Sequence, residues 1–232
     1  CVRMDEFSGR ICAADHLPWR RTGKEYWSDA DTTELRKHFE TKYKFRPSKQ
    51  DMKDAVIALA KKQQFHPVRN YLKALVWDGT PRLDTVFIDY LGVADSRYSR
   101  AVSRKSMVGA VARVMHPGCK FDYMLVLVGK QGRNKSTIIS KLAGPEWFSD
   151  SLVTFDGKNA FEAVTGKWLI EVPEMQAFDK ATMNQAKAFI TKQSDFYRAA
   201  YAEFPEDRPR QCVFFGTTNN AECLRDETGG RR

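Results

Sequence analysis

One stretch of the chain, residues 123–142, constrains the fold more than any other. It begins with the apolar run Tyr-Met-Leu-Val-Leu-Val, which is typical of a buried parallel strand, and it ends with an apolar helical pattern. Between them lie Gly129, the polar residues 130–134 and Lys-Ser-Thr at 135–137. This order predicts a phosphate-binding loop, because the N–H groups of the loop and of the helix N-terminus would face an anion.

Asn134 departs from the strict pattern G-x-x-x-x-G-K-[ST], which has glycine before the lysine. Asparagine enters the left-handed backbone region at lower cost than most non-glycine residues, so the loop stays compatible with the pattern. Lys135 would add a full positive charge. We therefore expect a nucleotide to be bound by Gly129, Gln131, Gly132, Arg133, Asn134, Lys135, Ser136 and Thr137.

The charge of the chain is positive and unevenly spread. The formal net charge is +9 and the isoelectric point is about 9.3. Residues 97–141 are rich in lysine and arginine, and Asp122 is the single acidic residue among them. This excess suits a polyanionic partner such as DNA, and it equally suits a merely soluble basic protein.

Cysteine usage favours a reducing, intracellular compartment. The five cysteines include no C-x-x-C pair, so neither a disulfide framework nor a zinc site is indicated. No signal peptide and no apolar run of transmembrane length is visible, and we expect a cytoplasmic location without membrane contact. Because the chain starts at Cys1 rather than methionine and ends in Gly-Gly-Arg-Arg, we interpret it as part of something longer.

Residues 1–80 predict a mainly helical accessory domain with a short β segment at its start. Aromatic and alternating residues before position 28 indicate a small hairpin or an irregular strand pair, and helix starts are expected at Asp31, Ser48 and His66. Helices joined by turns with basic residues also admit a DNA-binding interpretation. We favour the accessory domain, because nothing marks a recognition helix.

Residues 81–232 predict an α/β domain of the P-loop NTPase type, with a helical lead-in at 81–116 and an α/β core at 117–232. Alternation of buried strands with helices is the pattern of a mainly parallel sheet. Strands are expected at 123–128, 152–155, 168–172 and 213–218, and helices at 136–142, 158–164 and 180–192.

Two later strands end in polar side chains that suit a nucleotide site. A carboxylate at the end of a buried strand is costly unless it meets a cation or a proton, so Glu171 is expected to order Mg²⁺ beside the Ser136 hydroxyl. Glu174 would polarise the attacking water, and Asn219 would hydrogen-bond the γ-phosphate and that water. The alternatives are exposed turn carboxylates and a plain Asn-Asn turn.

These pieces together resemble the virulence-associated protein E family of phages and mobile genetic islands. That family looks like a superfamily 3 helicase-type (AAA+-like) P-loop ATPase. The resemblance implies ATP and Mg²⁺ as ligands, a hexameric ring, and DNA, single-stranded or at a replication origin, as the partner. The residues that carry it are 66–92, 98–137, 144–150, 166–175 and 209–232.

The resemblance also implies roles for individual residues. Superfamily 3 proteins place a hairpin in the DNA channel; the matching segment here is 195–210, although its middle is acidic rather than basic. Its candidate DNA contacts are Arg198 and Tyr201, with Lys192 just before it. The implied catalytic set is Lys135, Ser136 and Thr137 (Walker A), Glu171 and Glu174 (Walker B), Asn219 (sensor 1), and Arg231 or Arg232, with Arg225 nearby, as the arginine facing a neighbouring subunit.

Three functions remain open from the sequence. The first is an ATP-dependent, DNA-associated helicase-like motor that acts in replication of a mobile element. The second is a DNA-binding or interference module with a degenerate, non-hydrolysing loop, which would bind through residues 97–141. A small-molecule kinase is a weaker third, because the basic charge and the Thr-Thr-Asn at residues 217–219 count against it.

Overall fold

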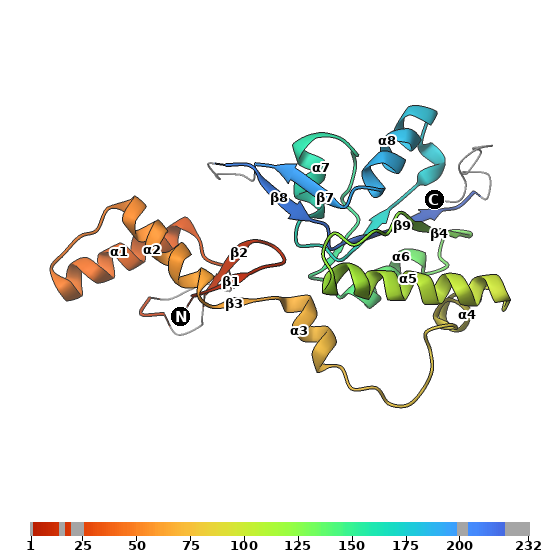
Figure 1. The fold of residues 1–232 in the computed structure, drawn as a ribbon, viewed down its shortest axis with the longest axis horizontal. Coiled ribbons are helices and arrows are strands. Elements are labelled where there is room, and N and C mark those ends of the chain that lie inside the picture. The colour runs from red at the N-terminus through yellow and green to blue at the C-terminus, as the bar shows by residue number, and fades with distance from the viewer. Residues whose placement is uncertain (1, 14–16, 20–25, 199–203, 221–232) are drawn as a thin grey trace. The chain divides into compact units, whose positions relative to one another are not determined.

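The computed structural model describes residues 2–13, 17–19, 26–198 and 204–220. The chain forms two compact units, Cys1–Leu75 and Val76–Arg232. Figure 1 traces both along the chain.

The first unit combines a small sheet with helices. β1 (Val2–Asp5) pairs antiparallel with β2 (Arg10–Ala13) and parallel with β3 (Gln64–Phe65). The helices of this unit are α1 (Asp29–Tyr43), α2 (Lys49–Lys61) and α3 (Pro67–Ala74). β1 and β2 form the hairpin expected at the start of the chain.

Side-chain caps begin these helices. Ser28 and Asp31 form a capping box at α1, so this helix starts earlier than the sequence indicated. Ser48 caps α2, and His66 caps α3, as expected. α3 ends at Ala74.

The second unit is an α/β domain. Its helical lead-in consists of α4 (Val86–Leu91) and α5 (Arg97–Met115), and α4 begins five residues after the expected start. No helix within the described ranges is both long and apolar enough to cross a bilayer. The remaining elements are β4 (Met124–Val128), α6 (Lys135–Ala143), β5 (Phe148–Ser149), α7 (Gly157–Val164), β6 (Leu169–Val172), the 3₁₀ turn η1 (Met175–Ala177), α8 (Lys180–Ile190), β7 (Ser194–Tyr197), β8 (Glu206–Pro209) and β9 (Val213–Thr218).

The central sheet of this unit has the order β4-β9-β6-β5, and its neighbouring strands pair in parallel. This confirms the α/β class and the parallel sheet. β9 is the last of these strands in the chain, yet it lies between β4 and β6. The carboxyl ends of β4, β9 and β6 therefore meet at one edge of the sheet.

The predicted strand at 152–155 is wrong. Leu152 and Phe155 are buried, but they lie in a loop, and the strand beside β6 is instead β5. Both side chains pack in the hydrophobic cluster that contains Ile170 and Phe189. The apolar pattern correctly indicates that these two side chains are buried. They are buried by packing against the cluster, and the segment does not pair with a strand.

Helices cover both faces of the sheet, with α5 and α6 on one side and α7 and α8 on the other (Figure 1). Ile170, Val172 and Phe214 pack in a cluster with residues of α7 and α8. Because successive side chains of a strand point to opposite faces, Glu171 points toward α6. The register sets Glu171 opposite Phe215, two residues before Thr217.

Candidate nucleotide-binding site

The loop between β4 and α6 has the backbone shape that the sequence indicated. Asn134 has φ 56° and ψ 25°, which is the left-handed conformation, and Gly132 also has positive φ. Asparagine tolerates this region better than other non-glycine residues, so the loop accommodates the replacement of the usual glycine. Gln131, Gly132 and Arg133 are exposed, and the first turn of α6 follows with N–H groups that have no acceptor within the helix.

Lys135, the first residue of α6, joins this loop to the end of β9. Its Nζ donates to the carbonyl oxygens of Gly129 (2.5 Å) and Lys130 (3.0 Å). It also donates to Oδ1 of Asn219 at 3.0 Å. These bonds use the three donors of an ammonium group. The lysine and the asparagine predicted from the sequence are therefore in direct contact.

Glu171 is a buried carboxylate, with 2% of its surface exposed. Its Oε1 accepts hydrogen bonds from Ser136 Oγ and Thr217 Oγ1, each at 2.6 Å. A charge in so dry a place needs such donors, or a cation, to be tolerated. Ser136 was expected beside Glu171, whereas Thr217 was not expected to take part.

Strand order explains these contacts. The loop follows β4, Asn219 follows β9 and Glu171 lies on β6, and these strands are neighbours in the sheet. Thr217 shares its face of β9 with Val213 and Phe215, since every second residue points the same way. The alternation is visible in the sequence, but only the pairing of β9 with β6 reveals that Thr217 meets Glu171.

Glu174 is a further predicted catalytic residue. Glu174 is exposed, has φ 51° and precedes η1. It follows the carboxyl end of β6, and the loop after β4 lies at the same edge of the sheet. Arg225, Arg231 and Arg232 lie outside the described residues.

The predicted nucleic-acid contacts lie around a hairpin that is present as expected. β7 and β8 pair antiparallel, with Asp195 opposite Arg208. Arg198 is exposed just after β7, and Tyr201 lies outside the described residues. Lys192 is exposed, and its ammonium sits 4.6 Å from the Phe161 ring centroid.

Part of the basic charge at residues 97–141 is neutralised or buried. Arg100 forms a close ion pair with Asp95, and Arg104 pairs with Asp84, which comes from the preceding segment. Both arginines hold the pKa of their carboxylate partner below its usual value. Arg113 is 1% exposed and burial lowers its pKa. The basic surface is thus smaller than the sequence suggested.

The residues around Glu171 fit a magnesium ion. Mg²⁺ prefers oxygen ligands and is usually held by one or two carboxylates together with substrate phosphates. The Ser136 hydroxyl and the Glu171 carboxylate supply such oxygens side by side. In the described part of the chain no group of three or more His, Cys, Asp or Glu residues could hold a metal. A magnesium ion here would therefore depend on the phosphates of a bound nucleotide.

The fold and the site define an α/β domain whose parallel strands gather a lysine, a carboxylate and an amide at one edge of the sheet. Residues 72–232 match the model of the virulence-associated protein E-like domain. The chain therefore belongs to the virulence-associated protein E-like family.

Solved structures show the same fold. The apo structure of the NrS-1 C terminal region (305-718) matches with a TM-score of 0.54 at 14% identity, over 100% of this chain and 57% of that chain. The A form apo structure of the same region matches with a TM-score of 0.55 at 13% identity, over 100% of this chain and 56% of that chain. This chain thus spans little more than half of their length. No curated protein matches it.

Proposed function

We infer that this chain binds Mg-ATP and belongs to a superfamily 3 helicase-like ATPase, which acts on DNA in the replication of a phage or mobile genetic element. The observation that supports this most is the hydrogen-bonded cluster of Lys135, Asn219, Ser136 and Glu171, which come from separate strand ends. Membership of the virulence-associated protein E-like family supports the biological setting.

In this proposal the phosphates lie against the first turn of α6. N–H groups at the positive end of the helix and the Lys135 ammonium would stabilise their charge. The Lys135 Nζ would exchange one of its carbonyl acceptors, Gly129 or Lys130, for a phosphate oxygen. Asn219 would hold that ammonium in place and present its amide to the terminal phosphate and the attacking water.

Ser136 and Glu171 would hold the magnesium ion, which neutralises phosphate charge when it is bound. Glu174, exposed beyond β6, would accept the proton of the attacking water. The proposal also includes a ring of subunits, in which Arg225, Arg231 or Arg232 would reach the nucleotide of a neighbouring subunit. DNA would be contacted through Lys192, Arg198 and Tyr201.

The test is ATP binding and phosphate release by the chain and its Lys135→Ala variant. We expect the variant to lose both, because it removes the charge at the helix N-terminus. Lys158→Ala is the matched control, since Lys158 is an exposed lysine paired with Glu162 on α7 and should leave both unchanged. Glu171→Gln should keep ATP binding and lose roughly 10²-fold or more in rate, in line with the effect of single groups that stabilise transition-state charge.

The competing function is the DNA-binding module with a non-hydrolysing loop. It predicts salt-sensitive DNA binding without any response to ATP. A wild-type chain that binds DNA but shows no ATP binding in titration calorimetry would favour this module and contradict the ATPase.

A further inference from the structure

An apolar groove runs beside the first turns of α6. Its volume is about 1100 Å³, and its walls come from the segment before α4, from α4 and α5, and from α6. Apolar and aromatic side chains of these walls include Leu83, Tyr90, Leu91, Met107, Ile138 and Leu142. Small-molecule sites are typically lined by such side chains and have volumes of about 300–1000 Å³. The groove thus has room for a nucleoside.

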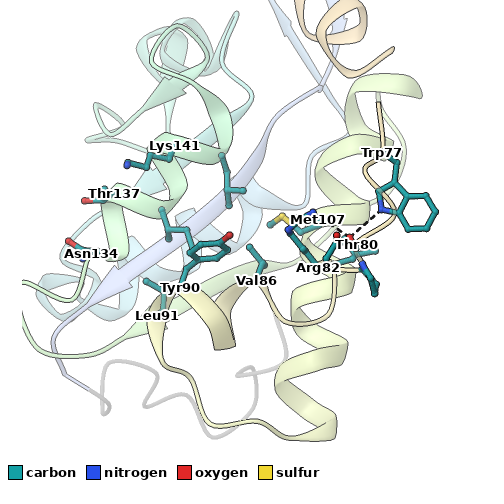
Figure 2. Close-up of a pocket in the computed structure, with 14 residues that line it drawn as sticks. Trp77, Thr80, Arg82, Val86, Tyr90, Leu91, Met107, Asn134, Thr137 and Lys141 are labelled. Atoms are coloured by element: carbon teal, nitrogen blue, oxygen red, sulfur yellow. Dashed lines mark hydrogen bonds between the residues drawn. The ribbon is translucent and has the colours of Figure 1, made fainter. Parts of the chain in front are cut away.

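The groove and the loop share residues. Asn134 and Thr137, from the turn expected to hold the phosphates, also line the groove. Figure 2 shows them with Lys141 along α6 at one end and Trp77 at the other, with the Tyr90 ring between. A molecule with its phosphates at the helix N-terminus would therefore extend directly into the apolar part.

The wall opposite α6 is held in place by hydrogen bonds and an ion pair. The fully buried Ser103 of α5 donates from Oγ to the Leu83 carbonyl at 2.7 Å. Beside it, Arg104 Nε donates to Asp84 Oδ1 at 2.6 Å. These contacts tie the segment before α4 to α5, so the groove does not need a ligand to shape it.

Tyr90 has an uncovered aromatic ring in this concave site. It lies on α4 and is 65% exposed. Aromatic rings that remain accessible within an apolar groove are suited to stacking on planar ligands. Base–aromatic stacking contributes about 1–3 kcal/mol per base in proteins that bind nucleotides of single strands.

We propose that this groove is the nucleobase subsite of the nucleotide site, with Tyr90 as the residue that stacks on the base. The proposal rests on the proposed ATP-binding function. It adds that affinity for the nucleoside part comes from α4 and α5, which precede the phosphate-binding loop in the chain. The free energy of base stacking corresponds to a roughly 5- to 150-fold difference in affinity between ATP and a ligand that has phosphates alone.

The test compares ATP with inorganic tripolyphosphate, both with Mg²⁺, by titration calorimetry on the chain. The wild type should bind ATP more tightly than tripolyphosphate. Tyr90→Ala should weaken ATP binding by roughly 5-fold or more and leave tripolyphosphate binding unchanged. Tyr90→Phe, which keeps the ring, should behave as the wild type.

Tyr98→Ala is the matched control, because Tyr98 is a 76% exposed tyrosine on α5 that does not line the groove. Circular dichroism would verify that each variant is folded. If Tyr90→Ala binds ATP as the wild type does, or weakens both ligands equally, the subsite is overturned while the phosphate site stands. If the wild type binds neither ligand, the ATP site itself fails.

Discussion

Thr217 is the residue whose contribution the sequence did not predict. Its hydroxyl donates to the same Glu171 oxygen as Ser136, at the same distance of 2.6 Å. If Ser136 turns toward a magnesium ion, Thr217 becomes the donor that keeps this buried carboxylate oriented. A hydrogen bond to a charged group contributes about 1.5–3 kcal/mol.

Thr217→Val should therefore reduce the rate of ATP hydrolysis about 10-fold or more. It should also raise the Mg²⁺ concentration needed for half-maximal rate, while ATP affinity changes little. Steady-state phosphate release over a magnesium titration measures both. Thr217→Ser restores the hydroxyl and should restore both values. A valine variant with wild-type magnesium dependence would refute the role of Thr217 in positioning Glu171.

Asn134 illustrates what residue identity alone predicts. The low cost of asparagine in the left-handed region can be read from the sequence, and the structure has this conformation at Asn134. Thr217 could not be found in this way. Its role depends on the neighbour of β9, and neighbouring strands are separated by many residues in the chain.

Among the elements, the hairpin of β7 and β8 is anchored at its base by a buried ion pair. Arg210 and Asp195 are 1% and 4% exposed, and the Nε of Arg210 lies 2.7 Å from the Asp195 carboxylate. Arg210 also donates to the Phe189 carbonyl and lies over the Phe189 ring. The hairpin is thus attached to the end of α8.

Asp195→Asn should lower the free energy of unfolding by about 3–5 kcal/mol, because it leaves the Arg210 charge buried without its partner. Urea denaturation measures this change. Asp95→Asn is the control: it removes one carboxylate of the exposed Arg100–Asp95 pair, where solvent screens the charge, and should have a much smaller effect. Equal effects of the two substitutions would show that burial does not determine how much an ion pair contributes to the free energy of unfolding.

The elements also show where periodicity succeeds and fails. Strands at 123–128, 168–172 and 213–218 were predicted and are present within one residue. β6 and β9 are buried as predicted, whereas β4 lies at the edge of the sheet and is only partly buried. The strand predicted at 152–155 is absent from that described segment, although Leu152 and Phe155 are buried as the pattern required. Periodicity reports which side chains avoid water, and a loop packed on a core satisfies the same requirement.

For the whole molecule, the described residues at the boundary between the two units are exposed. Leu75, Val76 and Trp77 are all exposed, Val76 at 92%. Leu75 follows the end of α3, and Val76 and Trp77 are the first residues of the second unit. Exposed segments outside regular structure are preferred sites of proteolysis, and chymotrypsin cuts after large apolar residues.

Brief digestion with chymotrypsin should therefore cut after Leu75 or Trp77 sooner than within the strands of the central sheet. Mass spectrometry of a time course would identify the sites. Trypsin offers a parallel check at Lys73, one residue before α3 ends. Cuts within β4, β6 or β9 that precede any cut at residues 73–77 would contradict the division into two units.

The sequence by itself determined the local unit at residues 123–142 and the α/β class. An apolar run, a turn of glycine and asparagine, and a helical pattern each depend on neighbours in the chain.

Only the tertiary structure decided which strand ends meet. β9 lies between β4 and β6, so Lys135 contacts Asn219, which is 84 residues away, and Thr217 contacts Glu171. The groove beside α6 likewise forms from segments far apart in the chain. Strand order and groove walls result from the packing of distant side chains, and no local pattern encodes such packing.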